Sequence, residues 1–158
     1  GLGMGFTLRA AQARAPADAR LTVSEIVPDL VDWATRHMEP VFADCLSDPR
    51  VAVETGDVRA AIDRATGAFD AILLDVDNGP DGLTRPDNDA LYGEAGLDRA
   101  RTALKPGGVL AIWSAAPDRA FSKRLSRCGY DVSEHTIRAG RSGRGARHTI
   151  WIAVRTEG

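Results

Sequence analysis

The sequence predicts an α/β fold in which a largely parallel sheet carries helices on both faces and ends in an antiparallel hairpin. Two observations predict this fold: short apolar strands alternate with amphipathic helices along most of the chain, and the last two strands follow each other with no helix between them. Alternation of strand and helix requires right-handed crossovers, which give parallel strands. The closing hairpin then adds one antiparallel strand to the sheet.

The strands are predicted where apolar residues alternate with polar ones or run together. The segment LTVSE alternates and ends in Glu25, and a second short strand is closed by Gly56. The run FDAILLD is apolar until its last residue, Asp75, which is typical of a central strand buried on both faces. The predicted strands cover residues 21–25, 50–57, 69–75, 108–114, 130–137 and 148–155.

The helices are predicted from apolar spacing and from the residues that start and end them. Pro28 fits the first turn of one helix, and Gly129 ends another in which Phe121 and Leu125 lie one turn apart. The predicted helices cover residues 6–15, 28–38, 58–65, 90–104 and 117–128. Residues 78–89 are dense in Gly, Pro, Asn and Asp, and this length indicates a functional loop. Residues 139–147 are predicted to form the hairpin loop.

Composition excludes several classes of partner. The chain has 158 residues, 44% apolar and 27% charged, with a net charge of −2, so neither nucleic acid nor a membrane is the expected partner. Cys45 and Cys128 form no CxxC pair, and no signal peptide or long apolar run is present, which favours a cytoplasmic protein. The length predicts one domain over residues 1–158.

The chain starts with GLGMGFT, a glycine-rich loop of the kind that normally follows a buried strand. No strand precedes it here, so we expect that the first, central strand of the sheet is missing from an N-terminally truncated domain. The sheet is then expected to have a gap or re-paired edges between the strands that end at Glu25 and Asp75. With its closing hairpin, the predicted topology is that of the class I methyltransferase fold, a Rossmann-like sheet. Plain dinucleotide-binding folds lack that hairpin.

Carboxylates at successive strand ends mark the expected site, because ligands of such sheets bind at the carboxyl ends of the strands. Glu25 lies about 20 residues after the glycine loop, the spacing at which a carboxylate accepts from both ribose hydroxyls. Asp57 follows the next strand, where it either binds an adenine amino group or caps the following helix. The predicted nucleotide-binding residues are Gly1, Gly3, Gly5, Glu25 and Asp57.

Asp75 is the predicted catalytic residue. It ends a wholly apolar strand, so we expect its carboxylate to be partly desolvated and directed into the cleft. Tyr92, beyond the long loop, and Trp113 and Ser114, at the end of the next strand, are expected to border the acceptor pocket. His37, His135 and His148 show no metal-ligand spacing, and no metal is predicted.

Seven segments together resemble the spermidine synthase-like family, the aminopropyltransferase relatives built on the methyltransferase fold. They are GLGMGFT, SEIVPDLVDWA, DPRVAVETGDV, FDAILLDVDNGPDGLT, LYGEAGL, LKPGGVLAIWS and HTIWIAV, and they run through nearly the whole chain. The resemblance implies that Asp75, the first acidic residue of the family's DxxD segment, helps to deprotonate the attacking amine. It also implies that Glu25 holds the ribose and Asp57 the adenine.

Three departures from the family pattern bear on the substrate. The second carboxylate of DxxD falls on Asn78, a neutral amide, although Asp77 lies beside it. Met4 stands in the glycine loop where the family usually has an acidic residue for the aminopropyl amine, and methionine suits an ordinary S-adenosylmethionine tail. The family's small N-terminal β-domain is absent from this sequence. Asp77, Asn78 and Tyr92 are the predicted substrate-binding residues.

The leading hypothesis is therefore a spermidine synthase-like transferase. It would bind S-adenosylmethionine or its decarboxylated form and transfer an aminopropyl or alkyl group to a small amine. The alternatives are a methyltransferase on another acceptor and a non-catalytic ligand-binding or interaction module. A homodimer stays open. NAD binding is disfavoured because Phe6 stands where GxGxxG needs its third glycine.

Overall fold

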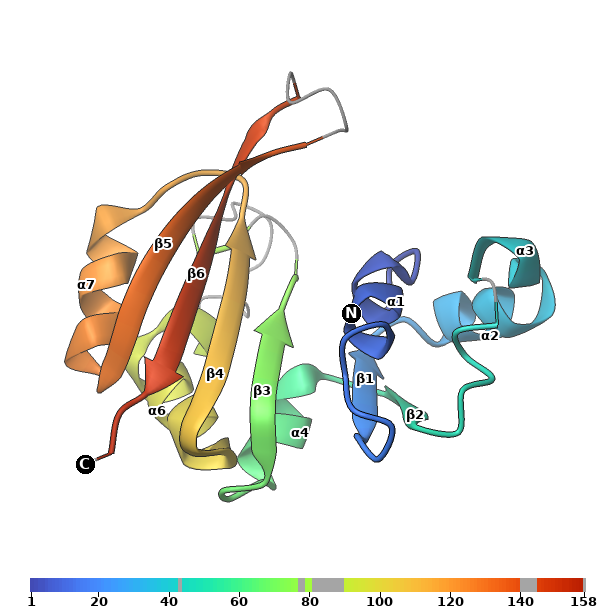
Figure 1. Cartoon of the computed structure of the whole chain (residues 1–158), viewed down its shortest axis with the longest axis horizontal. Helices are drawn as coiled ribbons and strands as arrows, with labels where there is room; N and C mark the ends of the chain where they lie inside the picture. Colours follow the sequence, from blue (N-terminus) through green and yellow to red (C-terminus); the bar gives the residue numbers. More distant parts are fainter. Residues whose placement is uncertain (43, 77–78, 81–89, 140–144, 158) are drawn as a thin grey trace. The chain divides into compact units, whose positions relative to one another are not determined.

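The computed structural model describes residues 1–42, 44–76, 79–80, 90–139 and 145–157. The chain forms two compact units, Gly1–Ala61 and Ile62–Gly158. Figure 1 shows the helices and strands of both. Among the described residues, no helix has the length and apolar character needed to cross a membrane.

The first unit combines short helices with a two-stranded parallel sheet. Strands β1 (Leu21–Glu25) and β2 (Val51–Thr55) pair in parallel from Leu21 opposite Val51 to Glu25 opposite Thr55. The helices are α1 (Phe6–Gln12), α2 (Pro28–Arg36) and α3 (Glu39–Phe42), while α4 (Val58–Asp63) crosses the boundary between the units. Their shared core consists of Leu2, Leu8, Ala34, Phe42 and Cys45.

Arg50 ties the start of β2 to the end of α1. Its guanidinium donates to the Asp48 carboxylate at 2.8 Å and to the carbonyl oxygens of Pro16 at 3.0 Å and Gln12 at 3.3 Å. The hydrogen bonds that the Arg50 guanidinium and backbone N–H donate to the Asp48 carboxylate hold its pKa well below the usual range. The DPR segment therefore has a structural role, because it fixes the connection that follows α1.

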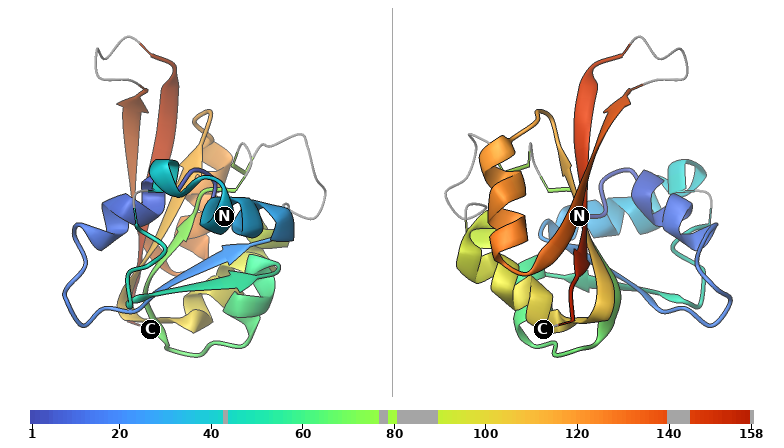
Figure 2. Two further views of the ribbon diagram at one scale, coloured as in Figure 1. Left: turned by 90° about the vertical axis from the view of Figure 1, so that its right-hand side faces the viewer. Right: turned by 60° about the vertical axis from the view of Figure 1, so that its left-hand side comes forward.

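The second unit is a four-stranded sheet with the order β3-β4-β6-β5. Its strands are β3 (Phe69–Leu74), β4 (Leu104–Ser114), β5 (Tyr130–Arg138) and β6 (Arg147–Arg155). Strands β3 and β4 are parallel, whereas β6 is antiparallel to both β4 and β5. Figure 2 shows the long hairpin that β5 and β6 form.

Helices α6 (Glu94–Ala103) and α7 (Arg119–Arg127) belong to one face of this sheet. Trp151 is fully buried on that face: its ring meets the Phe121 ring of α7 at 5.0 Å, and its indole N–H donates to the Ser122 hydroxyl at 2.8 Å. Trp113 and Ile150 form a cross-strand pair one position along from Ile112 and Trp151, so they lie on the opposite face.

The predicted class I methyltransferase fold is confirmed, with its closing antiparallel hairpin. A gap or re-paired edges were expected between the strands that end near Glu25 and Asp75, and β1 and β3 lie in separate sheets. Most helices are shorter than predicted, and α3 was not predicted. Strand β4 begins at Leu104, so residues 105–107, which lay between the predicted helix and the predicted strand, belong to it. The pairing of β4 with β3 shifts register between Phe69 and Ala71 of β3. The expected 78–89 loop falls outside the described residues except at Gly79 and Pro80.

Candidate functional site

Glu25 joins the glycine loop to the end of β1. Its carboxylate is only 5% exposed and accepts the Leu2 backbone N–H at 2.7 Å and the Val27 backbone N–H at 2.9 Å. One oxygen therefore holds the loop and the other holds the turn into α2. A carboxylate oxygen has two lone-pair sites, so each keeps one acceptor position for a further donor.

The glycine loop packs closely on its surroundings. A Cβ on Gly1 would lie 3.4 Å from the Glu25 carboxylate, and one on Gly5 would lie 2.8 Å from the Phe42 ring. Gly5 also has a left-handed backbone, with φ of 72°. Gly5 thus has a packing reason to be glycine, independent of any ligand. Gly3 has φ of 49° with open space around it, and Met4 is 42% exposed.

Two exposed apolar residues directly follow Glu25 and were missed in the sequence analysis. Ile26 is 55% and Val27 is 47% exposed, although both come immediately after a buried strand end. An apolar pair that follows a strand-end acid is a signal that the sequence already contained. Such side chains beside a buried carboxylate provide an apolar surface next to hydrogen-bond acceptors, which is how small-molecule sites are usually lined.

Asp57 is paired with Arg59. It accepts the Arg59 backbone N–H at 2.8 Å and the Arg59 guanidinium at 2.6 Å, which lowers its pKa below the usual value. The backbone hydrogen bond is the cap-like arrangement that was kept as the alternative to an adenine contact. An adenine amino group would bind Asp57 only by sharing a carboxylate to which the Arg59 guanidinium already donates.

Asp75 follows the last residue of β3, in the second unit, and its side chain is exposed. The expected partial desolvation is therefore wrong. Strand β3 ends at Leu74, so Asp75 extends beyond the apolar layer that buries Leu74. Its predicted catalytic role stays a prediction.

Gly79 packs closely against the end of β4. Gly79 has φ of 87°, and a Cβ there would lie 2.6 Å from the Cβ of Ser114, at the end of β4. Ser114 is 1% exposed. The Gly79 backbone thus packs directly on the end of β4.

Tyr92 is 2% exposed, so it is a core residue of the second unit. Its ring meets Phe121 edge-on at 5.9 Å, and its hydroxyl donates to the Val76 carbonyl at 3.5 Å. Tyr92 contacts the residue after Asp75 in this way. Asp77 and Asn78 fall outside the described residues, so their predicted role is not examined by the structure.

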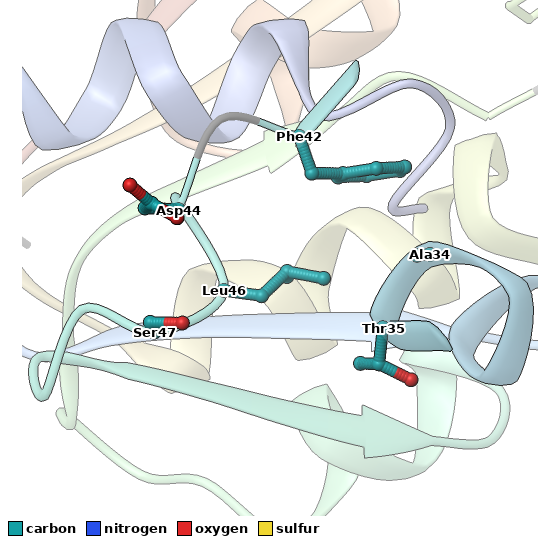
Figure 3. Close-up of a pocket in the computed structure, with 6 residues that line it drawn as sticks. All are labelled: Ala34, Thr35, Phe42, Asp44, Leu46 and Ser47. Atoms are coloured by element: carbon teal, nitrogen blue, oxygen red, sulfur yellow. The ribbon is translucent and has the colours of Figure 1, made fainter. Parts of the chain in front are cut away.

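A small pocket occupies another part of the first unit. It has a volume of about 140 Å³ and is lined by Phe42, Asp44, Leu46 and Ser47 together with Ala34 and Thr35 of α2 (Figure 3). None of the predicted site residues lines it.

Cysteine and histidine residues do not converge in the described part of the chain. No group of three or more His, Cys, Asp or Glu side chains that could hold a metal ion occurs there. Cys45 is buried and burial raises the pKa of its thiol, which leaves it a packing residue. His37 and His135 are exposed, and Trp33 is 55% exposed.

No known family profile matches the chain. The chain is 34% identical over 106 residues to the polyamine aminopropyltransferase of Nitrosomonas europaea, a match that covers 66% of the chain and 30% of that protein. It is 36% identical over 119 residues to putrescine N-methyltransferase 3 of Nicotiana tabacum, covering 72% of the chain and 29% of that protein.

The fold matches a spermidine synthase crystallised with the transition-state analogue AdoDATO. The TM-score is 0.74 at 17% identity, and the match covers 98% of the chain and 51% of that structure. At this identity the likeness concerns the fold. The chain spans about a third of the length of the curated relatives and half of this structure.

Proposed function

The chain belongs to the spermidine synthase-like family, and we propose that it binds S-adenosylmethionine or decarboxylated S-adenosylmethionine and transfers an aminopropyl or alkyl group to a small amine. Glu25 and the glycine loop would bind the nucleoside, and Asp75 would act on the acceptor. The proposal keeps residues 1–158 as one transferase domain that acts in the cytoplasm.

One observation carries the nucleoside part of this proposal: the buried Glu25 carboxylate beneath the glycine loop. Its two oxygens are fixed by the backbone N–H groups of Leu2 and Val27, yet each retains an acceptor position. Two fixed acceptors suit the two adjacent hydroxyls of a ribose. The exposed side chains of Ile26 and Val27 provide an apolar surface for the base. Asp57, already paired with Arg59, would contribute less.

The chemistry assigned to Asp75 is general base catalysis. Its carboxylate accepts a proton from the acceptor ammonium, and the neutral amine nitrogen attacks the carbon bonded to the sulfonium sulfur. The new C–N bond forms as the C–S bond breaks, and the bonding pair stays on sulfur as a neutral thioether. A positioned carboxylate base contributes a factor on the order of 10² to 10⁴. Holding the amine and carbon in line contributes more.

Titration calorimetry of the chain with S-adenosylmethionine, its decarboxylated form and NAD tests the proposal. We expect saturable binding of one or both sulfonium compounds, no binding of NAD, and a loss of at least tenfold in affinity in Glu25→Gln. Glu157→Gln, an exposed change near the C-terminus, is the matched control. Absence of binding by both sulfonium compounds would overturn the proposal.

Methyl transfer to an amine is the second candidate. Met4 favours it, because an exposed, uncharged side chain stands in the loop where a carboxylate would hold the aminopropyl ammonium. The likeness to a putrescine N-methyltransferase supports it as well. Mass spectrometry of a polyamine after incubation with each sulfonium compound separates the two reactions: methyl transfer adds one methyl group, and aminopropyl transfer adds a primary amine. For Met4→Asp we expect a shift of preference toward the decarboxylated compound.

A further inference from the structure

We propose that the tip of the β5–β6 hairpin, formed by Ile137, Arg138, Arg147 and His148, binds the phosphate backbone of duplex DNA. The inference goes beyond the proposed transfer reaction and does not depend on it. All the residues that carry it belong to the second unit.

The tip extends past the strand that supports the rest of the hairpin. Strand β4 pairs with β6 only as far as Ser114 opposite Thr149. The pairing of β5 with β6 continues further, to Arg138 opposite Arg147. The tip is therefore a two-stranded ribbon that no other described strand flanks, as Figure 2 shows. A ribbon of two strands fits the major groove of B-DNA, which is about 12 Å wide.

Two arginines lie directly opposite each other in the outermost pair of this ribbon. Arg138 and Arg147 are both exposed, although like charges directly opposite on neighbouring strands destabilise a sheet. Arg155, near the other end of β6, has partners within the protein, because it donates to the carbonyl oxygens of Arg101 and Leu104. Arg138 and Arg147 have no ion pair or side-chain hydrogen bond with any residue that the structure describes. Their exposure without a partner indicates an anion from outside the chain.

The charge of the hairpin is separated from that of the rest of the chain. Residues 135–156 contain five arginines and no Asp or Glu, although the whole chain has a net charge of −2. The nearest carboxylate on β5, Glu134, accepts the Ser122 hydroxyl at 3.0 Å and pairs with Trp151, away from the tip. The net charge predicted no nucleic-acid partner, because it averages over this separation. The tip itself is cationic, as binding to a phosphate backbone requires.

The side chains of the tip favour a duplex over a single strand. Proteins that bind single strands without sequence preference stack the bases on aromatic side chains. Residues 137–148 contain no Phe, Tyr or Trp, and the His148 imidazole already lies 4.9 Å from the Trp113 ring of β4. Arginine, in contrast, binds phosphate oxygens through two parallel N–H groups. Directly opposite residues have Cβ atoms about 5 Å apart, so both guanidiniums can contact one backbone.

Fluorescence anisotropy with a short labelled DNA duplex of mixed sequence tests the inference on the intact chain, without any turnover. We expect saturable binding at about 50 mM salt that weakens as the salt concentration rises. In Arg138→Gln/Arg147→Gln, the affinity at low salt should fall at least tenfold. The slope of log affinity against log salt concentration should become shallower by about 1.8, because each lost phosphate contact removes about 0.9.

Two matched variants separate the arginine pair from the overall charge. Arg14→Gln/Arg20→Gln removes the same charge from exposed positions of the first unit and should leave affinity and slope unchanged. Arg138→Lys/Arg147→Lys keeps the charge at the tip, so it should keep the slope and lose less affinity than the glutamine variant. The urea midpoint of Arg138→Gln/Arg147→Gln should equal that of the wild type or exceed it, because the like charges no longer face each other. Its loss of binding is then not a loss of folding.

Four results would overturn the inference. The first two are the absence of saturable binding to the duplex and an equal loss of affinity in Arg14→Gln/Arg20→Gln. The third is equal or tighter binding of the matching single strand, which would contradict the assignment to a duplex. The fourth is displacement of the duplex by polyglutamate as effectively as by unlabelled duplex at the same concentration of negative charge. That result would assign the tip to an acidic protein instead.

Discussion

Glu25 serves the fold and the proposed site with the same two oxygens. Because the carboxylate is buried and accepts from the backbone N–H groups of Leu2 and Val27, its removal should alter both stability and the proposed binding of the nucleoside. The sequence allowed the carboxylate to be placed at a strand end. It did not reveal the Leu2 partner, since that hydrogen bond joins residues 23 positions apart in the sequence.

Replacing Glu25 should destabilise the first unit. In Glu25→Gln an amide N–H₂ faces a backbone N–H, so one hydrogen bond is lost and a buried donor stays unsatisfied. We expect a loss of about 2 kcal/mol in the free energy of unfolding, measured by urea denaturation. Glu157→Gln should unfold like the wild type, and equal midpoints for the two variants would contradict the structural role of Glu25.

Asp48 should make the first unit sensitive to acid. Its folded pKa lies below the unfolded value of about 3.9, because of its hydrogen bonds to Arg50. The stabilisation is therefore complete above that value and is lost as the pH falls below it. In Asp48→Asn, urea midpoints measured from pH 6 to pH 2.5 should fall less steeply with acid than in the wild type. Asp18→Asn, an exposed change in the same unit, is the control; a steeper fall in Asp48→Asn would reverse the assigned sign.

Gly79 should not accept a side chain. Gly79→Ala combines a left-handed φ with a Cβ that meets Ser114, so we expect a loss of about 1 to 3 kcal/mol in stability. Gly67 also has a left-handed φ, of 53°, but open space around it. Gly67→Ala should therefore lose only the stability that a strained backbone costs. Ser114→Gly should recover part of the loss when combined with Gly79→Ala. Full additivity of the two changes in thermal denaturation would show that they do not touch.

At the level of elements, residue spacing predicted the helices whose burial and ends depend on neighbouring residues in the sequence. The amphipathic spacing of Phe121 and Leu125 predicted α7, in which both side chains are fully buried, and Gly129 ends it with φ of 81°. The irregular start of β4 was not predictable, because it depends on pairing with Phe69 far back in the chain. The exposure of Asp75 was mispredicted for a related reason: the apolar run indicated burial of the strand, while the strand itself stops at Leu74.

Asp118 should contribute to the stability of α7. Its carboxylate accepts the backbone N–H groups of Ala120 at 2.7 Å and Phe121 at 3.0 Å. Removal of an N-cap costs about 1 kcal/mol, so Asp118→Ala should lower the free energy of unfolding by that amount. Asp118→Asn should lose less, because its amide oxygen still accepts. Denaturation curves in which Asp118→Asn is the more damaged variant would contradict this assignment.

At the scale of the whole molecule, the two sheets differ in how their strands are supported. Strands β4 and β6 each have partners on both sides, whereas β1 and β2 have one partner each. A two-stranded sheet is marginally stable on its own.

Hydrogen exchange should therefore be slower in the second sheet. We expect the amides of Ile112, Trp151 and Ala153, all fully buried, to exchange at least tenfold more slowly than those of Val23 and Val53. Mass spectrometry of deuterated peptides measures both regions in one sample. Equal protection of the two sheets would mean that the chain opens as one cooperative unit.

The hydrogen bonds of Glu25 also link ligand occupancy to heat resistance. A molecule that binds to the folded glycine loop, and not to the unfolded chain, raises the melting temperature in proportion to the logarithm of its concentration over Kd. Glu25 ends β1, in the two-stranded sheet that we expect to unfold first on heating. A bound ligand should therefore raise the temperature of this first unfolding step. A thermal-shift screen of sulfonium nucleosides thus identifies the donor before any acceptor is known.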